Sequence, residues 1–145
     1  MVSCTKKSNS PTPTETKTQL LTGKNWKMTA QTCNPGIVIS GTLITDIYAF
    51  LISNGSACFL DNISNFYTDG TYTVNEGATL CDPQDPQLNN TGIWSFQNSE
   101  TTLIQDGIAY TIVTLNSTTL KLKSLEDFDG DGIDETEINT TYTKQ

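Results

Sequence analysis

The sequence predicts an all-β fold, an eight-stranded antiparallel up-and-down barrel with one short helix, and leaves a two-sheet β-sandwich as the alternative. Threonine, which is β-branched and favours pleated, half-buried surfaces, occurs 25 times in 145 residues and is spread along the chain. Apolar and polar residues alternate over short runs, and no long stretch places apolar residues every three or four positions. Gly, Asn and Asp separate these runs, as tight turns require.

The first strand is expected around Trp26. Trp26, Met28 and Ala30 alternate with Lys27 and Thr29, which gives a strand with one apolar face. The short helix is expected over residues 45–53, where Thr45 is suited to cap the start and Asn54-Gly55 to end the helix.

The clearest hairpin lies between residues 66 and 74. Residues 66–68 (FYT) and 71–74 (TYTV) flank Asp69-Gly70, a two-residue turn of the kind that needs positive φ. Five further strands are expected at residues 92–96, 101–105, 108–115, 118–125 and 135–144. Eight strands are enough for a sheet to close around side chains or one small ligand.

The charged residues exclude several classes of function. The chain has eight Lys, no Arg, no His and a net charge of −8. Without His there is no Ser-His-Asp or Cys-His catalysis and no imidazole metal site. The excess of negative charge argues against nucleic-acid binding, which needs clustered cations. Glu126 and Asp127 are a pair of carboxylates, but they lie in a turn without a visible apolar pocket, so we expect no catalytic residue and no enzyme.

The amino-terminal residues 1–19 differ in composition from the rest. Cys4 follows small and aliphatic residues and precedes a run rich in Thr, Ser, Pro and Lys that has almost no apolar surface to bury. This arrangement resembles the processing site of a bacterial lipoprotein, in which the cysteine carries acyl chains. We therefore expect a lipid anchor on Cys4, a disordered tether to residue 19 and a single domain over residues 20–145.

Several segments of that domain resemble the lipocalin-like domains of secreted and lipid-anchored proteins from Bacteroidetes-type bacteria. In chain order they are residues 20–24 (LLTGK) before a Trp, 41–49 (GTLITDIYA), 66–77 (FYTDGTYTVNEG), 81–83 (CDP), 92–96 (GIWSF) and 118–122 (TTLKL). The chain departs from the family at Gly23-Lys24-Asn25-Trp26, which is one residue longer than the Gly-x-Trp typical of lipocalins.

The resemblance implies a barrel whose calyx binds a small apolar or amphiphilic molecule, without enzymatic activity. It also implies a bacterial outer-membrane or cell-surface location, facing the periplasm or the exterior, with the lipid anchor as the contact to the membrane. We expect a monomer. The side chains expected inside the barrel are Trp26, Met28, Phe66, Tyr72, Trp94, Phe96, Tyr110, Leu120, Leu122 and Tyr142.

These side chains could instead fill the interior as a packed core. The alternative function is then a surface interaction module with a filled barrel, which would contact protein or glycan through loops that include residues 33–46 and 82–91.

The family also has cysteines near the positions of Cys58 and Cys81, which lie on either side of the predicted hairpin. The resemblance thus favours a disulfide between Cys58 and Cys81, with Cys33 as a free thiol. Pairing of Cys33 with Cys58 stays open.

The acidic segment of residues 127–135 (DFDGDGIDE) is the sharpest local motif. Carboxylates at alternate positions with Gly at the sixth position can wrap a calcium ion. The candidate ligands are Asp127, Asp129, Asp131, the carbonyl of Ile133, and Glu135. The twelfth position is Ile138 rather than Glu, so the EF-hand pattern is incomplete, and an exposed hairpin turn is the competing interpretation.

Overall fold

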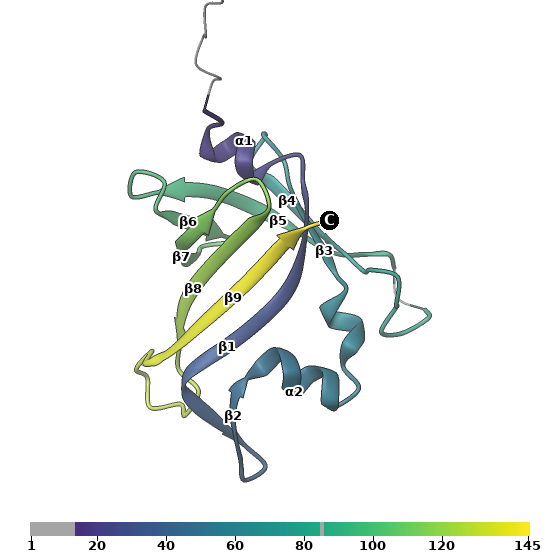
Figure 1. Ribbon diagram of the computed structural model, residues 1–145, viewed down its shortest axis with the longest axis vertical. Helices are drawn as coiled ribbons and strands as arrows, with labels where there is room; N and C mark the ends of the chain where they lie inside the picture. The colour runs from purple at the N-terminus through teal and green to yellow at the C-terminus, as the bar shows by residue number, and fades with distance from the viewer. Residues whose placement is uncertain (1–13, 85) are drawn as a thin grey trace, which may run out of the picture.

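The computed structural model describes residues 14–84 and 86–145. Over these residues the chain forms nine antiparallel strands, eight of which close into a barrel (Figure 1). The strands are β1 (Asn25–Ile39), β2 (Thr42–Asp46), β3 (Ile63–Phe66), β4 (Thr71–Asn75), β5 (Leu88–Gln97), β6 (Thr102–Gln105), β7 (Ile108–Leu115), β8 (Thr119–Glu126) and β9 (Thr136–Lys144). The sheet order is β2-β1-β3-β4-β5-β6-β7-β8-β9, and β9 also pairs with β1.

The pairing of the first and last strands closes the barrel. It runs from Trp26 opposite Lys144 to Asn34 opposite Glu137, with a register shift between Met28 and Ala30. Every barrel strand pairs with the strands before and after it in this ring. The predicted eight-stranded up-and-down barrel is therefore confirmed, and a sandwich of two separate sheets is wrong.

The hairpin between β3 and β4 also forms. Gly70 has a φ of +85°, and the Asp69 carboxylate accepts the backbone N–H of Thr71 at 2.9 Å. The strand β3 ends at Phe66, so Tyr67 and Thr68 belong to the turn rather than to the strand.

The segment of residues 33–46, expected as a loop, is instead a hairpin. The strand β1 continues to Ile39 and pairs with β2, with Val38 opposite Leu43 and Ile37 opposite Ile44. Ser40 and Gly41 turn the chain with φ values of +50° and +80°. The expected loop of residues 82–91 is shorter than predicted, since β5 begins at Leu88.

The predicted short helix is α2 (Ile47–Ser53). Its cap is Asp46, whose carboxylate accepts the N–H of Ala49 at 2.8 Å. The prediction of Thr45 as the cap is wrong because the helix begins at Ile47, so the residue directly before it is Asp46. Gly55, with a φ of +75°, follows the helix end as expected. A 3₁₀ turn, η1 (Ala57–Leu60), connects this region to β3.

A second helix, α1 (Lys17–Leu21), starts within the segment that was expected to be a tether. Thr16 and Gln19 form a capping box, and the Lys17 ammonium donates to the carbonyl of Glu100 at 2.6 Å. Ordered structure therefore begins before residue 20. None of the helices in the described residues is long and apolar enough to cross a membrane.

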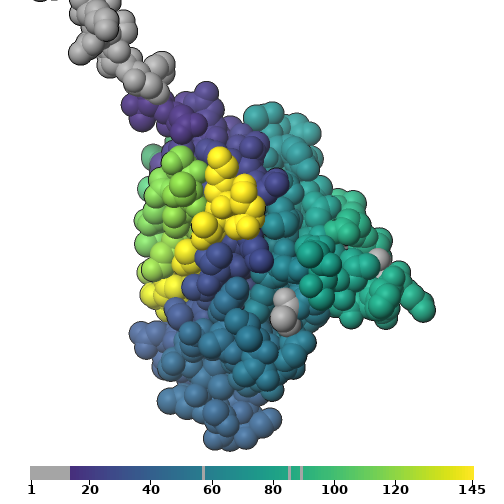
Figure 2. All heavy atoms as spheres, turned by 45° about the vertical axis from the view of Figure 1, so that its right-hand side comes forward, coloured from purple at the N-terminus to yellow at the C-terminus, as the bar shows by residue number. Residues whose placement is uncertain are grey.

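Helix α1 covers one end of the barrel and completes the packed core. Leu21 and Trp26 are both fully buried, and the indole Nε1 of Trp26 donates to the carbonyl of Leu21 at 2.8 Å. The other buried members of this cluster are Phe66, Tyr72, Trp94, Leu103, Leu120 and Leu122. Figure 2 shows the opposite end, formed by the β1–β2 hairpin and α2, and the β4–β5 connection that projects from the side of the molecule.

Candidate functional site

A cavity of about 510 Å³ lies in the half of the barrel away from α1. Seven barrel strands, α2 and Phe128 line it. Its apolar walls come from β1 and α2 through Ile37, Ile39, Ile47, Phe50 and Leu51, and from Val74, Phe128 and Ile138. Cavities of this size hold small organic molecules.

Polar side chains line the same space. They are Gln31, Ser64, Gln105, Ser124, Glu126 and Thr140, together with three tyrosines. The cavity therefore combines apolar surface with a limited number of hydrogen-bonding groups, as sites for apolar and amphiphilic ligands do.

The three tyrosines are Tyr72, Tyr110 and Tyr142. Burial, and then a hydrogen bond to Asp106, raises the pKa of Tyr72 to about 12. Burial also raises the pKa of Tyr142 to about 12. The pKa of Tyr110 is raised by burial and then by the carboxylates of Glu126 and Asp106. All three phenols thus keep their protons at neutral pH.

The structure divides the ten predicted interior residues between the cavity and the packed core. Tyr72, Tyr110 and Tyr142 line the cavity. Tyr72 also belongs to the buried cluster, with five others of the ten: Trp26, Phe66, Trp94, Leu120 and Leu122. Phe96, Tyr110 and Tyr142 pack against this cluster. Met28 is half-buried and lies in neither group.

Contacts between aromatic rings fill the closed half of the barrel. The rings of Phe66 and Trp94 meet edge to face with centroids 6.0 Å apart, and those of Trp94 and Phe96 with centroids 5.2 Å apart. This half therefore has the tight packing of a core.

Sequence reasoning missed most of the polar lining. Ser64, Ser124 and Thr140 lie on the inward faces of their strands because Ser64 is opposite Val74, Ser124 is opposite Ile138, and Thr140 is opposite Leu122. Apolar alternation does not mark these three positions, because their side chains are polar. Extending the alternation along each strand could nevertheless have located two of them. Ser124 follows Leu120 and Leu122 on the same face of β8, and Thr140 lies between Ile138 and Tyr142 on the same face of β9.

A second hollow of about 420 Å³ adjoins the cavity. It shares Ile37, Ile39 and Phe128 with the cavity, and its charged residues are Asp129 and Glu135. The acidic segment thus lies beside the cavity rather than in a remote turn.

The acidic segment brings three of its five predicted ligands together. Oxygen atoms of Asp127, Asp129 and Asp131 all lie within 4.8 Å of one another. Asp127 accepts the N–H groups of Gly132 and Gly130 at 2.9 and 2.7 Å, and these two bonds lower the pKa of its carboxyl.

The other two predicted ligands are placed differently. Partial desolvation and then the nearby Asp129, Asp131 and Asp127 raise the pKa of Glu135, but Glu135 is not among the carboxylates that share the 4.8 Å group. Ile133 donates its N–H to the Asp131 carboxylate at 2.8 Å. The loop can therefore offer three carboxylates to a cation, and calcium binding stays a prediction.

Glu126 and Asp127, the pair weighed as catalytic carboxylates, lie in different surroundings. Glu126 lines the cavity, so an apolar pocket does lie beside it. The Asp127 oxygens accept backbone N–H groups of the acidic loop.

The cysteines pair as the family resemblance implied. Cys58 and Cys81 form a disulfide with their Cα atoms 5.2 Å apart, which ties η1 to the β4–β5 connection. The alternative pairing of Cys33 with Cys58 is wrong, because Cys33 is a buried free thiol in β1 that donates to the carbonyl of Ile44 at 3.1 Å. Cys4, the expected lipid site, lies outside the described residues.

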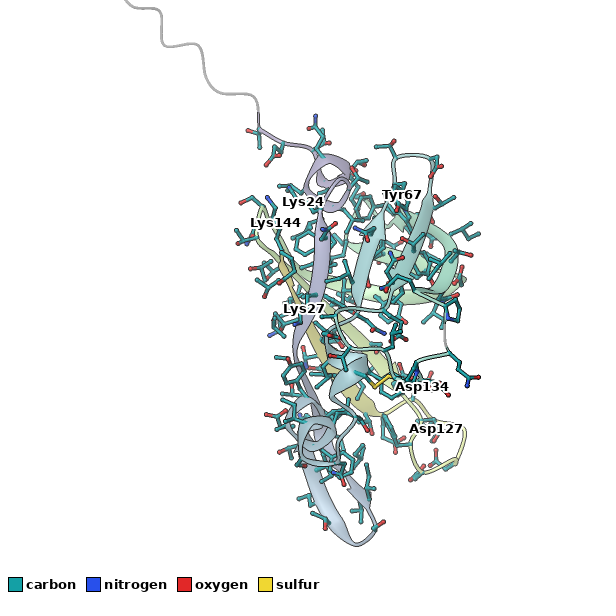
Figure 3. All side chains as sticks on the ribbon, turned by 90° about the vertical axis from the view of Figure 1, so that its right-hand side faces the viewer. Lys24, Lys27, Tyr67, Asp127, Asp134 and Lys144 are labelled. Atoms are coloured by element: carbon teal, nitrogen blue, oxygen red, sulfur yellow. A yellow bond between two sulfur atoms is a disulfide. The ribbon has the colours of Figure 1, made fainter. Side chains whose placement is uncertain are left out.

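Figure 3 shows where several of the charged residues lie along the barrel. Lys24 and Lys144 lie near the end that α1 covers, with Lys27 further along the barrel, whereas Asp127 and Asp134 lie toward the other end. The end with Asp127 and Asp134 is the one that carries the cavity.

Among known proteins, no family model and no curated protein matches this chain.

Proposed function

We propose that this protein binds a small apolar or amphiphilic molecule non-covalently inside its barrel, as a lipid-anchored, lipocalin-like protein of the cell envelope. The observation that carries the proposal is the cavity of about 510 Å³ built into one half of the closed barrel. Because residues of seven barrel strands line this space, it argues against a barrel filled along its whole length by its own side chains.

Burial of apolar ligand surface would supply most of the affinity. Each 100 Å² of apolar surface removed from water contributes about 2.5 kcal/mol before the costs of immobilising the ligand. The phenols of Tyr110 and Tyr142 would orient a polar group, because both line the cavity and stay protonated at neutral pH.

A pair of neighbouring substitutions tests whether binding occurs in the cavity. Ser124 lines the cavity, and Leu125, the next residue, is 55% exposed. Ser124→Phe should occupy cavity volume and abolish binding of dodecanol measured by calorimetry, whereas Leu125→Phe should leave it unchanged. Equal binding by both folded variants would contradict the proposal, as would native mass spectra of protein from its own cells that show no bound small molecule.

The lipid anchor on Cys4 is a separate part of the proposal. Its support is the sequence around Cys4, which follows small and aliphatic residues and precedes a run rich in Thr, Ser, Pro and Lys. With such an anchor, α1 at the closed end of the barrel would direct the cavity away from the membrane. Protein extracted from its own cells should show the mass of acyl chains on the peptide that contains Cys4. An unmodified peptide there would contradict the anchor but not the ligand site.

A surface interaction module is the second candidate function. Val38 and Leu43 face each other across the β1–β2 hairpin and are 69% and 65% exposed. Exposed apolar pairs of this kind are common where proteins meet. Leu43→Thr should weaken partner capture in cross-linking experiments if the hairpin is the interaction surface. It should not change dodecanol binding, because Leu43 lines neither the cavity nor the adjoining hollow.

A further inference from the structure

The charges around the cavity restrict which apolar molecules it can hold. Among the residues that the structure describes, Glu126 is the one charged side chain that lines the cavity. None of the lysines in the described part of the chain lines it; they are Lys17, Lys24, Lys27, Lys121, Lys123 and Lys144. A ligand therefore meets a carboxylate and no cation.

The adjoining hollow has the same charge. Asp129 and Glu135 are its charged residues, and Ile37, Ile39 and Phe128 connect it to the cavity. A ligand that extends from the cavity into this hollow would meet further carboxylates. The lysines Lys121 and Lys123 lie on the neighbouring strand β8, but Lys123 forms an ion pair of 3.2 Å with Glu137 instead of lining either hollow.

The negative charge also acts inside the cavity. Tyr110 is a lining residue, and the carboxylates of Glu126 and Asp106 both raise its pKa. Any anionic group placed beside Tyr110 would experience the same two carboxylates. An anion held there would lose water without gaining a cationic partner, which is costly in a partly apolar site.

We propose that the cavity selects apolar molecules with a cationic amine head group, held beside the Glu126 carboxylate, over anionic molecules of the same chain length such as fatty acids. This inference rests on the proposed function. The amine would pair with Glu126, while its alkyl chain would lie against Ile47, Phe50 and Leu51 of α2.

Three probes that differ only in the head group test the selection. They are dodecylammonium, dodecanol and dodecanoate, each titrated calorimetrically into the full chain below its micelle concentration and with a chelator present. We expect affinity to fall in the order ammonium, alcohol, carboxylate. Glu126→Gln should weaken dodecylammonium binding by about fivefold, the upper range for an ion pair that reaches solvent, and leave dodecanol unchanged.

Glu137→Gln is the matched control, because it removes the same charge from β9 at a position paired with Lys123 outside the cavity. It should not alter the order of affinities. Equal affinities for dodecylammonium and dodecanoate, or an equal effect of both substitutions, would overturn the charge selection while leaving the ligand site in place. Failure of all three probes to bind would instead overturn the proposed function.

Discussion

The hydroxyl of Tyr72 on β4 donates a hydrogen bond of 2.6 Å to the carboxylate of Asp106 in the turn between β6 and β7. The other oxygen of Asp106 accepts the backbone N–H of Ile93 at 2.9 Å. Gly92 leaves the space for this arrangement, because a Cβ at that position would overlap the carboxylate. One side chain thus connects three segments of the barrel beside the cavity.

The Tyr72–Asp106 bond should make stability depend on acid pH. The bonds from Tyr72 and then Ile93 lower the pKa of Asp106 below its ordinary value of 3.8. The stabilisation is therefore present above that value and is lost as the pH falls through the lowered pKa. At pH 7 the free energy of unfolding measured with urea should be larger for the wild type than for Tyr72→Phe. This difference in free energy should shrink in strong acid.

Tyr67→Phe is the control for this comparison. The hydroxyl of Tyr67 bonds to the Thr73 hydroxyl at 3.2 Å and to no carboxylate that titrates in acid. Tyr67→Phe should therefore change the free energy of unfolding by the same amount at pH 7 and in strong acid. A constant difference between wild type and Tyr72→Phe across this range would contradict the assigned cause.

Two phenols should titrate late at alkaline pH. The pKa values of Tyr72 and Tyr142 are both raised from 10.0 to about 12. Between these values the unfolded chain loses protons that the folded chain keeps, so stability falls as the pH rises from 10 toward 12. Absorbance at the phenolate band should show a component near pH 12 that shrinks in Tyr142→Phe, and a single transition near pH 10 in wild type would count against it.

Truncating the contact between α1 and the core should destabilise the barrel. Leu21 is fully buried, so Leu21→Ala should lower the free energy of unfolding by about 2–5 kcal/mol. The same truncation at Leu43, which is 65% exposed, should change it by less than about 0.5 kcal/mol. Equal effects in chemical denaturation would show that α1 is not part of the folded unit.

Removal of the disulfide should destabilise the protein, because the unfolded chain gains conformational entropy when the cross-link is absent. Cys58 and Cys81 are separated by 23 residues, a loop for which the chain-entropy relation gives about 3 kcal/mol. The double substitution of Cys58 and Cys81 by Ala should lower the free energy of unfolding by about this amount. Cys33→Ala removes a buried thiol without opening a cross-link and should cost less; the reverse order would refute the explanation.

Calcium should raise the melting temperature if the acidic loop binds it, since a ligand of the folded state stabilises that state. The effect should disappear in Asp129→Asn, which removes one carboxylate from the group of three. Asp82→Asn, at an exposed turn outside the loop, should retain it. The absence of a shift at saturating calcium would dispose of the site and leave the segment as an exposed turn.

Most strands of the barrel could be predicted from alternating apolar residues on their inward faces, as in Leu120 and Leu122. The β1–β2 hairpin could not. Cys33-Asn34-Pro35-Gly36 has the composition of a strand end, yet β1 passes through it with a register shift between Thr32 and Ile37 and continues to Ile39. Tertiary pairing with β2 and β9 outweighs the local signal.

The cavity was predictable only in part. Tyr72, Tyr110 and Tyr142 were found because aromatic residues on inward faces are conspicuous. Ile37 and the residues of α2 also line the cavity. Their position depends on how the β1–β2 hairpin and α2 pack over the end of the barrel, and local sequence patterns do not predict this packing. The sequence also does not indicate that the packed cluster stops partway along the barrel.

The seam between β1 and β9 imposes an order on folding. These strands come from opposite ends of the domain, and they pair from Trp26 opposite Lys144 to Asn34 opposite Glu137. The barrel can close only after the last strand has left the ribosome, so every earlier intermediate exposes two strand edges. Such long-range pairing slows folding and prolongs exposure to aggregation. Loss of residues 142–145 would remove the pairs that Trp26, Lys27 and Met28 make with β9, and would therefore open the seam at the end that α1 covers.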